Sequence, residues 1–378
     1  MIMTEFYYHK MNRFIIQRKS SCFLEQLLLI FLISILLTGC GKIDTNNLET
    51  VCITDEIDEQ EIVEDDGEDT MSTTSFTEEE KNMMAGKQQI SDANEENLTV
   101  SKDIGSEEDI IIFPDMRLNN RNDNNEYGEL THVTYYSNTC KKERGMNIQL
   151  PANYSEEKSY PVLYVLHGIF GDEYSMCGDG KTGIPVLIDN LISEGSAKEM
   201  ITVYPFMYAS STQDQCTAID DENVAAYDNF INELVDDIMP YIKENYSILE
   251  GKENTAVTGF SMGGRESLAI GIYRPDLFGY VGSIAPAPGL VPGSDIHLNH
   301  PGQFSEDEIT YTEEKPYLIM ICAGDKDSVV GTFPKSYDKL YTENGIDHIW
   351  WEVPGSDHGD PAITSGIYNF LKKIFIEE

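Results

Sequence analysis

The sequence predicts an α/β protein with a mostly parallel central sheet flanked by helices on both faces. After two initial strand patterns, short apolar runs alternate with helical patterns, which is the order typical of a parallel sheet. Two of these runs end in glycine-containing segments, Gly-Phe-Ser-Met-Gly at 259–263 and His-Gly at 167–168, where tight turns are expected. About 250 residues follow an acidic N-terminal region, enough for a single α/β core.

The predicted strands are eight short apolar runs bounded by turn residues. They cover Leu130–Tyr136, Met146–Leu150, Val162–Leu166, Ile201–Tyr204, Ala256–Gly259, Tyr280–Ile284, Tyr317–Cys322 and Ile349–Val353. Between the fourth and fifth runs, apolar residues recur at steps of three and four from Tyr227 to Tyr246, which predicts one helix with a buried face and an acidic outer face. Pro240 lies inside this helix and predicts a kink.

Ser261 is the predicted nucleophile, because it stands in a Gly-x-Ser-x-Gly pattern directly after a predicted strand. A serine on such a strand-to-helix turn projects its hydroxyl from the end of the sheet, and the flanking glycines let backbones pass closely. A neutral hydroxyl is a poor nucleophile until a base removes its proton, so an acid and a histidine are required as well.

The acid and the base are expected after later strands, in that order. The run ending at Ala323 opens into Gly-Asp-Lys-Asp-Ser, and we predict Asp327 as the acid; the alternative is Asp325, since an Asp after a strand also caps turns. The last predicted strand opens into Pro-Gly-Ser-Asp-His-Gly, which makes His358 the predicted base.

A serine mechanism also needs donors aimed at the developing oxyanion. The loop His167 to Gly171 follows a buried strand in the manner of oxyanion turns, so the backbone N–H of Ile169 is one predicted donor. The N–H of Met262, at the start of the helix after the serine, is the other. His167 is expected to orient this loop and to take no part in proton transfer.

With these motifs in hand, the chain resembles the feruloyl and acetyl-xylan esterases of the esterase D superfamily, which have the α/β-hydrolase fold. The resemblance runs from about Gly128 to the C-terminus through LYVLHGIFGDE, GFSMGG, AGDKDSVV and GSDHG. It implies that Ser261, Asp327 and His358 form the triad, with Asp327 preferred over Asp325. Phe170 and the polar loop 291–314 depart from the family pattern and leave the acyl and sugar specificity open.

The resulting prediction is a serine carboxylesterase without a cofactor, whose substrate is an acylated carbohydrate or a small ester. Feruloyl or acetyl groups on xylan are the substrates that the resemblance implies. Five aromatic residues on loops after strands or at a helix start are predicted to contact the substrate: Phe170, Tyr174, Phe206, Tyr208 and Tyr227. A siderophore esterase, an acyl transferase and a non-catalytic surface binding protein remain alternatives on the same fold.

The N-terminus carries a predicted lipoprotein signal. Basic residues precede the apolar run Leu27 to Leu37, and Leu-Thr-Gly-Cys at 37–40 resembles a bacterial lipobox. Cleavage before Cys40 would leave a lipidated cysteine that anchors the protein outside the cytoplasm; an uncleaved membrane helix is the alternative. The predicted organisation is therefore signal peptide 1–39, linker 40–115 and catalytic domain 116–378.

The linker is predicted to be disordered, because it is rich in Glu, Asp, Ser and Thr and poor in aromatic residues. A net charge of -40 for the whole chain argues against nucleic acid as a partner and against charge-driven binding to anionic lipid, so Cys40 is the only predicted membrane contact. The oligomeric state is left open.

Cysteines and histidines outside the triad have weaker predictions. Cys177 and Cys216 both follow strands near the expected cleft, so a disulfide between them is one possibility and two free thiols the other. His297 and His300 share a polar loop, but no third ligand at suitable spacing accompanies them, so no metal site is predicted.

Overall fold

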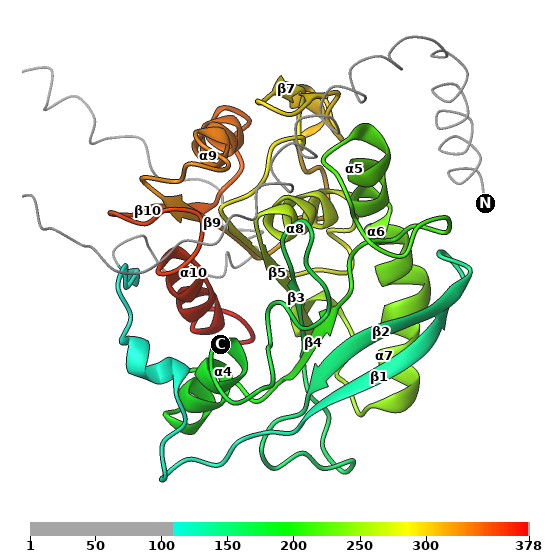
Figure 1. Ribbon diagram of the computed structural model, residues 1–378. Coiled ribbons are helices and arrows are strands. Elements are labelled where there is room, and N and C mark those ends of the chain that lie inside the picture. Colours follow the sequence, from blue (N-terminus) through cyan, green and yellow to red (C-terminus); the bar gives the residue numbers. More distant parts are fainter. Residues whose placement is uncertain (1–108, 377–378) are drawn as a thin grey trace, which may run out of the picture. The chain divides into compact units, whose positions relative to one another are not determined.

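The computed structural model describes residues 109–376, which form a central sheet with helices packed against it (Figure 1). Eight strands make this sheet in the order β1-β2-β4-β3-β5-β6-β9-β10. Their bounds are β1 Leu130–Ser137, β2 Lys142–Gln149, β3 Val162–Leu166, β4 Ile201–Pro205, β5 Thr255–Phe260, β6 Tyr280–Ile284, β9 Leu318–Gly324 and β10 Ile349–Val353. The pairs β1–β2 and β2–β4 are antiparallel and all others are parallel, which confirms the predicted fold class.

The burial of each strand follows its place in the sheet. The inner strands β3, β4, β6 and β9 are buried at every residue, as expected where helices cover both faces. The edge strand β10 alternates buried and half-buried residues. Each of the eight predicted runs forms one of these strands, although β2 begins at Lys142, four residues before the prediction, because its first half is polar.

Helices cover both faces of the sheet. On one face lie α8 (Met262–Tyr273), α9 (Phe333–Glu343) and the helical chain from α5 (Asp221–Asp228) to α7 (Met239–Asn245). On the other face lie α4 (Ile184–Ser193) and α10 (Ala362–Leu371), which Figure 1 shows side by side. Each face has its own core of buried apolar side chains.

The predicted single helix from Tyr227 to Tyr246 is wrong in its continuity. The structure has α5, then α6 (Phe230–Glu233), a π-helical turn at Leu234–Ile238, and α7. Proline has no N–H, so Pro240 cannot donate to the carbonyl four residues earlier. The Met239 N–H instead bonds to the Leu234 carbonyl five residues back, and this wider turn absorbs the proline.

Smaller elements lie in the connections. The loop 291–314 contains a two-strand hairpin and one 3-10 turn, and two further 3-10 turns lie in other segments of the described residues. The elements are β7 Gly293–Ser294, β8 Asn299–His300, and turns at Met116–Asn119, Lys252–Asn254 and Glu306–Glu308.

The N-terminal boundary of the packed domain lies before residue 116. The Ile111 N–H donates to Asn369 Oδ1 at 2.9 Å, and Asn369 Nδ2 donates back to the Ile111 carbonyl at 2.9 Å. The linker was predicted to extend to residue 115, but Ile111 is already bonded to Asn369 of α10. The predicted signal peptide, Cys40 and the rest of the linker lie outside the described residues. Within residues 109–376, no helix has the length and apolar character to span a membrane.

Candidate active site

Ser261 lies at the sharp turn between β5 and α8. Its backbone has φ 58° and ψ −115°, a conformation that non-glycine residues rarely adopt and that nucleophile turns hold under strain. The Ser261 N–H donates to the Ile284 carbonyl of β6 at 2.9 Å, which fixes the turn to the neighbouring strand. The residue is 4% exposed, so the turn is almost completely buried.

The glycines on either side of Ser261 are required by close backbone contacts. A Cβ on Gly259 would lie 2.5 Å from the Gly263 carbonyl carbon, and a Cβ on Gly263 would lie 2.4 Å from the Leu166 carbonyl oxygen. Real Cβ atoms do not approach so closely, so the first turn of α8 can rest against the end of β3 only with glycine at these positions.

The structure brings Ser261, His358 and Asp327 together. His358 Nε2 lies 2.9 Å from Ser261 Oγ, and His358 Nδ1 lies 2.7 Å from Asp327 Oδ2. Because a carboxylate accepts, Nδ1 carries the proton and Nε2 is left to accept from the serine hydroxyl. This is the tautomer that a general base toward serine requires.

Asp327 is held by the turn that follows β9. Its Oδ1 accepts from the Val329 and Val330 N–H groups at 3.0 and 2.9 Å, which leaves Oδ2 for the histidine. The alternative, Asp325, accepts instead from the Gly355 N–H at 2.6 Å. The structure therefore brings Asp327, and not Asp325, to the imidazole.

The predicted oxyanion loop lies beside the serine. A Cβ on Gly168 would be 3.4 Å from Ser261 Cβ, so the loop backbone passes directly over the nucleophile. The Phe170 N–H donates to Tyr227 Oη at 3.1 Å and the Gly171 N–H donates to the Gly168 carbonyl at 3.2 Å, whereas the Ile169 N–H is in neither bond. Met262 is the first residue of α8, so its N–H has no acceptor within the helix.

The His167 side chain fixes this loop through hydrogen bonds at both of its ring nitrogens. Its Nδ1 donates to the Gly168 carbonyl at 2.7 Å, and its Nε2 accepts from the Met207 N–H at 2.9 Å. These two partners fix one neutral tautomer, and burial lowers the pKa of His167 to about 4. A ring engaged at both nitrogens orients the loop and has no free nitrogen for proton transfer.

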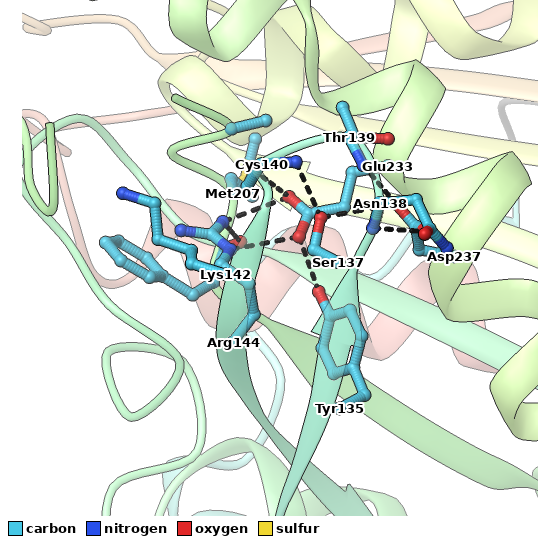
Figure 2. Close-up of polar contacts among 12 residues, drawn as sticks. Tyr135, Ser137, Asn138, Thr139, Cys140, Lys142, Arg144, Met207, Glu233 and Asp237 are labelled. Atoms are coloured by element: carbon cyan, nitrogen blue, oxygen red, sulfur yellow. Dashed lines mark hydrogen bonds and ion pairs between the residues drawn. The ribbon is translucent and has the colours of Figure 1, made fainter. Parts of the chain in front are cut away.

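A buried ion pair supports the chain segment that contacts His167 (Figure 2). Arg144 Nε donates to Glu233 Oε1 at 2.9 Å, and Tyr135 Oη donates to the same oxygen at 2.8 Å. The guanidinium also donates from Nη2 to the Phe206 carbonyl at 2.6 Å and lies 4.5 Å from the centroid of the Phe206 ring. The pair thus ties the β1–β2 hairpin to the end of β4, next to Met207.

The five predicted substrate contacts divide into exposed and buried residues. Phe170 and Tyr174 are 55% and 45% exposed, and Phe206 is half-buried against the His167 ring at 5.8 Å between centroids. Tyr208 and Tyr227 are 1% and 0% exposed, so the prediction that they contact the substrate does not fit their burial. Tyr208 Oη donates to Asn223 Oδ1 at 2.6 Å, and Tyr227 accepts from the oxyanion loop, so both are supports.

Cys177 and Cys216 are free thiols, so the possible disulfide between them is not formed. Cys177 packs in the core on the α4 side of the sheet, whereas Cys216 packs against the core on the other side. His300 Nε2 bonds to Asp295 Oδ2 at 3.1 Å, and within residues 109–376 no group of three or more His, Cys, Asp or Glu side chains could hold a metal.

Three supporting residues were missed from the sequence. Arg144 and Met207 act through groups that only the fold brings near the site, and no local pattern signals them. Asp357 had a visible signal, because an Asp directly before the predicted base can bond to nearby backbone N–H groups. Its carboxylate accepts from the His358 N–H at 2.8 Å.

The strand order and the site geometry are those of the α/β-hydrolase class. Residues 137–359, more than half of the chain, match the family model described as "Putative esterase". The chain therefore belongs to this esterase family, whose members are carboxylic ester hydrolases.

The chain is also similar to individual proteins. An endo-1,4-beta-xylanase/feruloyl esterase from Xylanibacter ruminicola is 31% identical over 214 residues, which are 54% of this chain but only 26% of that protein. A CE1 ferulic acid esterase from Anaeromyces mucronatus, solved in complex with ferulic acid, is 47% identical with a TM-score of 0.67, and the match covers 70% of this chain and 97% of that one. These similarities confirm the predicted resemblance.

The fold extends to more distant structures. The feruloyl esterase module from Clostridium thermocellum, solved as a mutant complexed with sinapinate, is 20% identical with a TM-score of 0.52, covering 70% of this chain and 93% of that one. At this identity the similarity concerns the fold alone.

Proposed function

We propose that the chain is a serine carboxylesterase that releases feruloyl or acetyl groups from plant polysaccharide such as xylan. The observation that carries the proposal is the hydrogen-bonded line from Ser261 Oγ through the His358 ring to Asp327, with distances of 2.9 and 2.7 Å. The substrate class is supported by a relative named endo-1,4-beta-xylanase/feruloyl esterase and by a similar structure named ferulic acid esterase, which was solved with ferulic acid.

In the acylation step, Ser261 Oγ attacks the ester carbonyl while His358 Nε2 accepts the hydroxyl proton. The Ile169 and Met262 N–H groups donate to the oxyanion of the tetrahedral intermediate. Asp327 stabilises the imidazolium through its bond to Nδ1. His358 then gives its proton to the sugar oxygen, and the alcohol leaves with the acyl group bound to Ser261.

In the second step, water takes the place of the alcohol. His358 removes a proton from this water as it attacks the acyl carbonyl, and the same two N–H groups receive the second oxyanion. The carboxylic acid leaves and the serine recovers its proton. All atoms and protons balance without a cofactor.

Phe170, Tyr174 and Phe206 are the proposed substrate contacts. The first two are exposed on the loop that carries the Ile169 amide, and the third follows β4 beside His167. Aromatic rings at the rim of a cleft offer flat apolar surface to a phenolic acyl group or a sugar ring.

The proposed location is the outer surface of the cell membrane, with the lipid on Cys40. It is supported by the basic-then-apolar N-terminal pattern and the Leu-Thr-Gly-Cys string at 37–40. A polymeric substrate cannot enter the cell intact, so an enzyme that acts on it has to work outside.

The test is hydrolysis of methyl ferulate, acetylated xylan and 4-nitrophenyl acetate by the full chain and by Ser261→Ala. We expect turnover by the wild type and a loss of at least about 10³-fold in kcat in the variant, with an unchanged thermal midpoint. Full activity of Ser261→Ala would refute the serine mechanism. Activity on 4-nitrophenyl acetate without activity on either plant-type ester would refute the substrate class.

A further inference from the structure

The turns that carry Asp327 and His358 are joined along their backbones. They follow the adjacent strands β9 and β10, and the approach is so close that a Cβ on Gly324 would lie 2.1 Å from the Ser356 carbonyl oxygen. The Lys326 N–H donates to this same carbonyl at 3.0 Å. The relative position of acid and base therefore depends on how these two turns are held together.

Two carboxylates cross between the turns in opposite directions. From the histidine turn, Asp357 Oδ1 accepts from the Ser328 N–H at 2.8 Å and from Ser328 Oγ at 2.9 Å. From the acid turn, Asp325 Oδ1 accepts from the Gly355 N–H at 2.6 Å. Each carboxylate satisfies donors on the other turn, which is more specific than packing alone.

Of these two carboxylates, Asp357 is the one linked directly to both the acid turn and the base. Ser328 follows Asp327 in the chain, and Asp357 precedes His358, whose N–H it also accepts at 2.8 Å. One carboxylate thus accepts three hydrogen bonds, two from Ser328, which follows the acid, and one from the backbone of the base His358. It forms no hydrogen bond with Ser261, so it acts on the reaction only through the two residues it holds.

We propose that Asp357 is a positioning residue that sets the distance between Asp327 and His358; the inference rests on the proposed serine mechanism. The Ser328 and His358 N–H groups hold the pKa of Asp357 below its usual value, so the carboxylate is an ionised acceptor throughout the neutral range. Because Asp357 is exposed, its bonds contribute little to global stability, and their effect falls on local geometry. Misplacement of reacting groups by about 1 Å can cost about 10²-fold in rate.

The experiment compares Asp357→Ala, Asp357→Asn and Ser328→Ala in the full chain, with 4-nitrophenyl acetate. For Asp357→Ala we expect kcat to fall about 10- to 100-fold, with KM within about twofold and the thermal midpoint within about 2 °C of wild type. Asp357→Asn keeps an acceptor oxygen for the N–H groups and should recover most of kcat. Ser328→Ala loses only the hydroxyl bond, so its kcat should lie between those of Asp357→Ala and the wild type.

The matched control is Asp347→Ala, which removes a carboxylate that is 94% exposed and, among residues 109–376, pairs with Lys315 at 3.5 Å. It should leave kcat and KM unchanged. A wild-type kcat in Asp357→Ala would overturn the inference. So would a lower thermal midpoint in Asp357→Ala if Asp357→Asn restores neither the midpoint nor kcat, because the loss would then come from destabilisation. Ser261→Ala runs alongside: if it stays active the serine mechanism itself fails, whereas if it is inactive and Asp357→Ala is normal, only the positioning role fails.

Discussion

Each side chain of the triad has its hydrogen-bonding state set by its partners. Asp327 accepts two backbone N–H bonds on one oxygen and the histidine on the other, so it presents a single oriented acceptor. That acceptor fixes the proton on His358 Nδ1, and Nε2 is thereby directed to Ser261. The serine, held at positive φ, cannot rotate its backbone away without losing the turn.

The choice between the two aspartates gives a residue-scale prediction. Asp327→Asn keeps the size of the side chain but can no longer stabilise the imidazolium, so kcat should fall by about 10³- to 10⁴-fold. Asp325→Asn still accepts from the Gly355 N–H and should lose less than about tenfold. Steady-state rates on 4-nitrophenyl acetate measure both, and a larger loss in Asp325→Asn would reverse the assignment of the acid.

The burial of His167 predicts a pH dependence of stability. Its pKa in the folded protein is about 4, below the ordinary value of 6.5, so the unfolded chain binds a proton between these values that the folded chain does not. Stability is therefore present above pH 6.5 and is lost as the pH falls toward 4. His167→Gln has no such titrating group. Between pH 7.5 and pH 4.5 its free energy of unfolding should therefore fall by about 2 to 3 kcal/mol less than that of the wild type.

Urea unfolding at the two pH values makes this comparison, and Gln is the better replacement because its amide can both donate and accept. Because every other titrating group is shared by the two proteins, their contributions cancel in the difference. Equal losses in wild type and variant would mean that the ring is accessible to protons in the folded state.

At the scale of elements, the site is an assembly of strand ends. The turns after β3, β5, β9 and β10 meet at the edge where the parallel strands end, as ligand sites in open α/β sheets do. The hairpin β1–β2 adds support from outside the parallel part through Arg144 and Glu233 (Figure 2). A helix start, an oxyanion loop and two triad turns are thus fixed by one sheet.

The contact between α8 and β3 gives an element-scale prediction. A methyl group on Gly263 would lie 2.4 Å from the Leu166 carbonyl oxygen, so Gly263→Ala should push the helix from the strand and cost at least about 2 kcal/mol of unfolding free energy. The control is Gly168→Ala, whose methyl would meet Ser261 Cβ at 3.4 Å, an ordinary contact. Thermal melts should separate the two variants, and equal midpoints would contradict the packing argument.

Much of this arrangement could be predicted from the sequence because the signals are local. Buried parallel strands appear as apolar runs, and triad turns follow them in a fixed order, so Ser261 and His358 could be named from strand ends, and the acid could be narrowed to Asp327 or Asp325. The broken helix could not, because a π-helical turn depends on how Pro240 is accommodated by the residues before it. The burial of Tyr208 and Tyr227 was missed because a position after a strand or near a helix start does not reveal whether a ring faces the cleft or the core.

At the scale of the whole molecule, the chain combines a folded domain with a long acidic N-terminal region. The folded domain begins before residue 116, since the Ile111 N–H already bonds to Asn369 of α10. The predicted signal peptide and Cys40 lie in the N-terminal region, outside the described residues. The anchor remains a prediction, and the proposed reaction does not require it. Anchoring and catalysis can therefore be tested separately.

The anchor prediction is tested on protein extracted from membranes of a bacterial host that expresses the full chain. Intact mass should correspond to cleavage before Cys40 with a diacylglyceryl group on that cysteine. Cys40→Ser should abolish both the added mass and the cleavage, while esterase activity per molecule stays the same. A wild-type chain that retains its N-terminal residues would favour the uncleaved membrane helix.

The central claim is that Ser261 Oγ is the atom that becomes acylated, and covalent labelling tests it most directly. A fluorophosphonate probe reacts with an activated serine, and peptide mass spectrometry then identifies the modified residue. We expect one label per molecule, on Ser261, with labelling slowed at least about 10²-fold in His358→Ala. A label on another residue, or an active enzyme that takes no label at Ser261, would contradict the account.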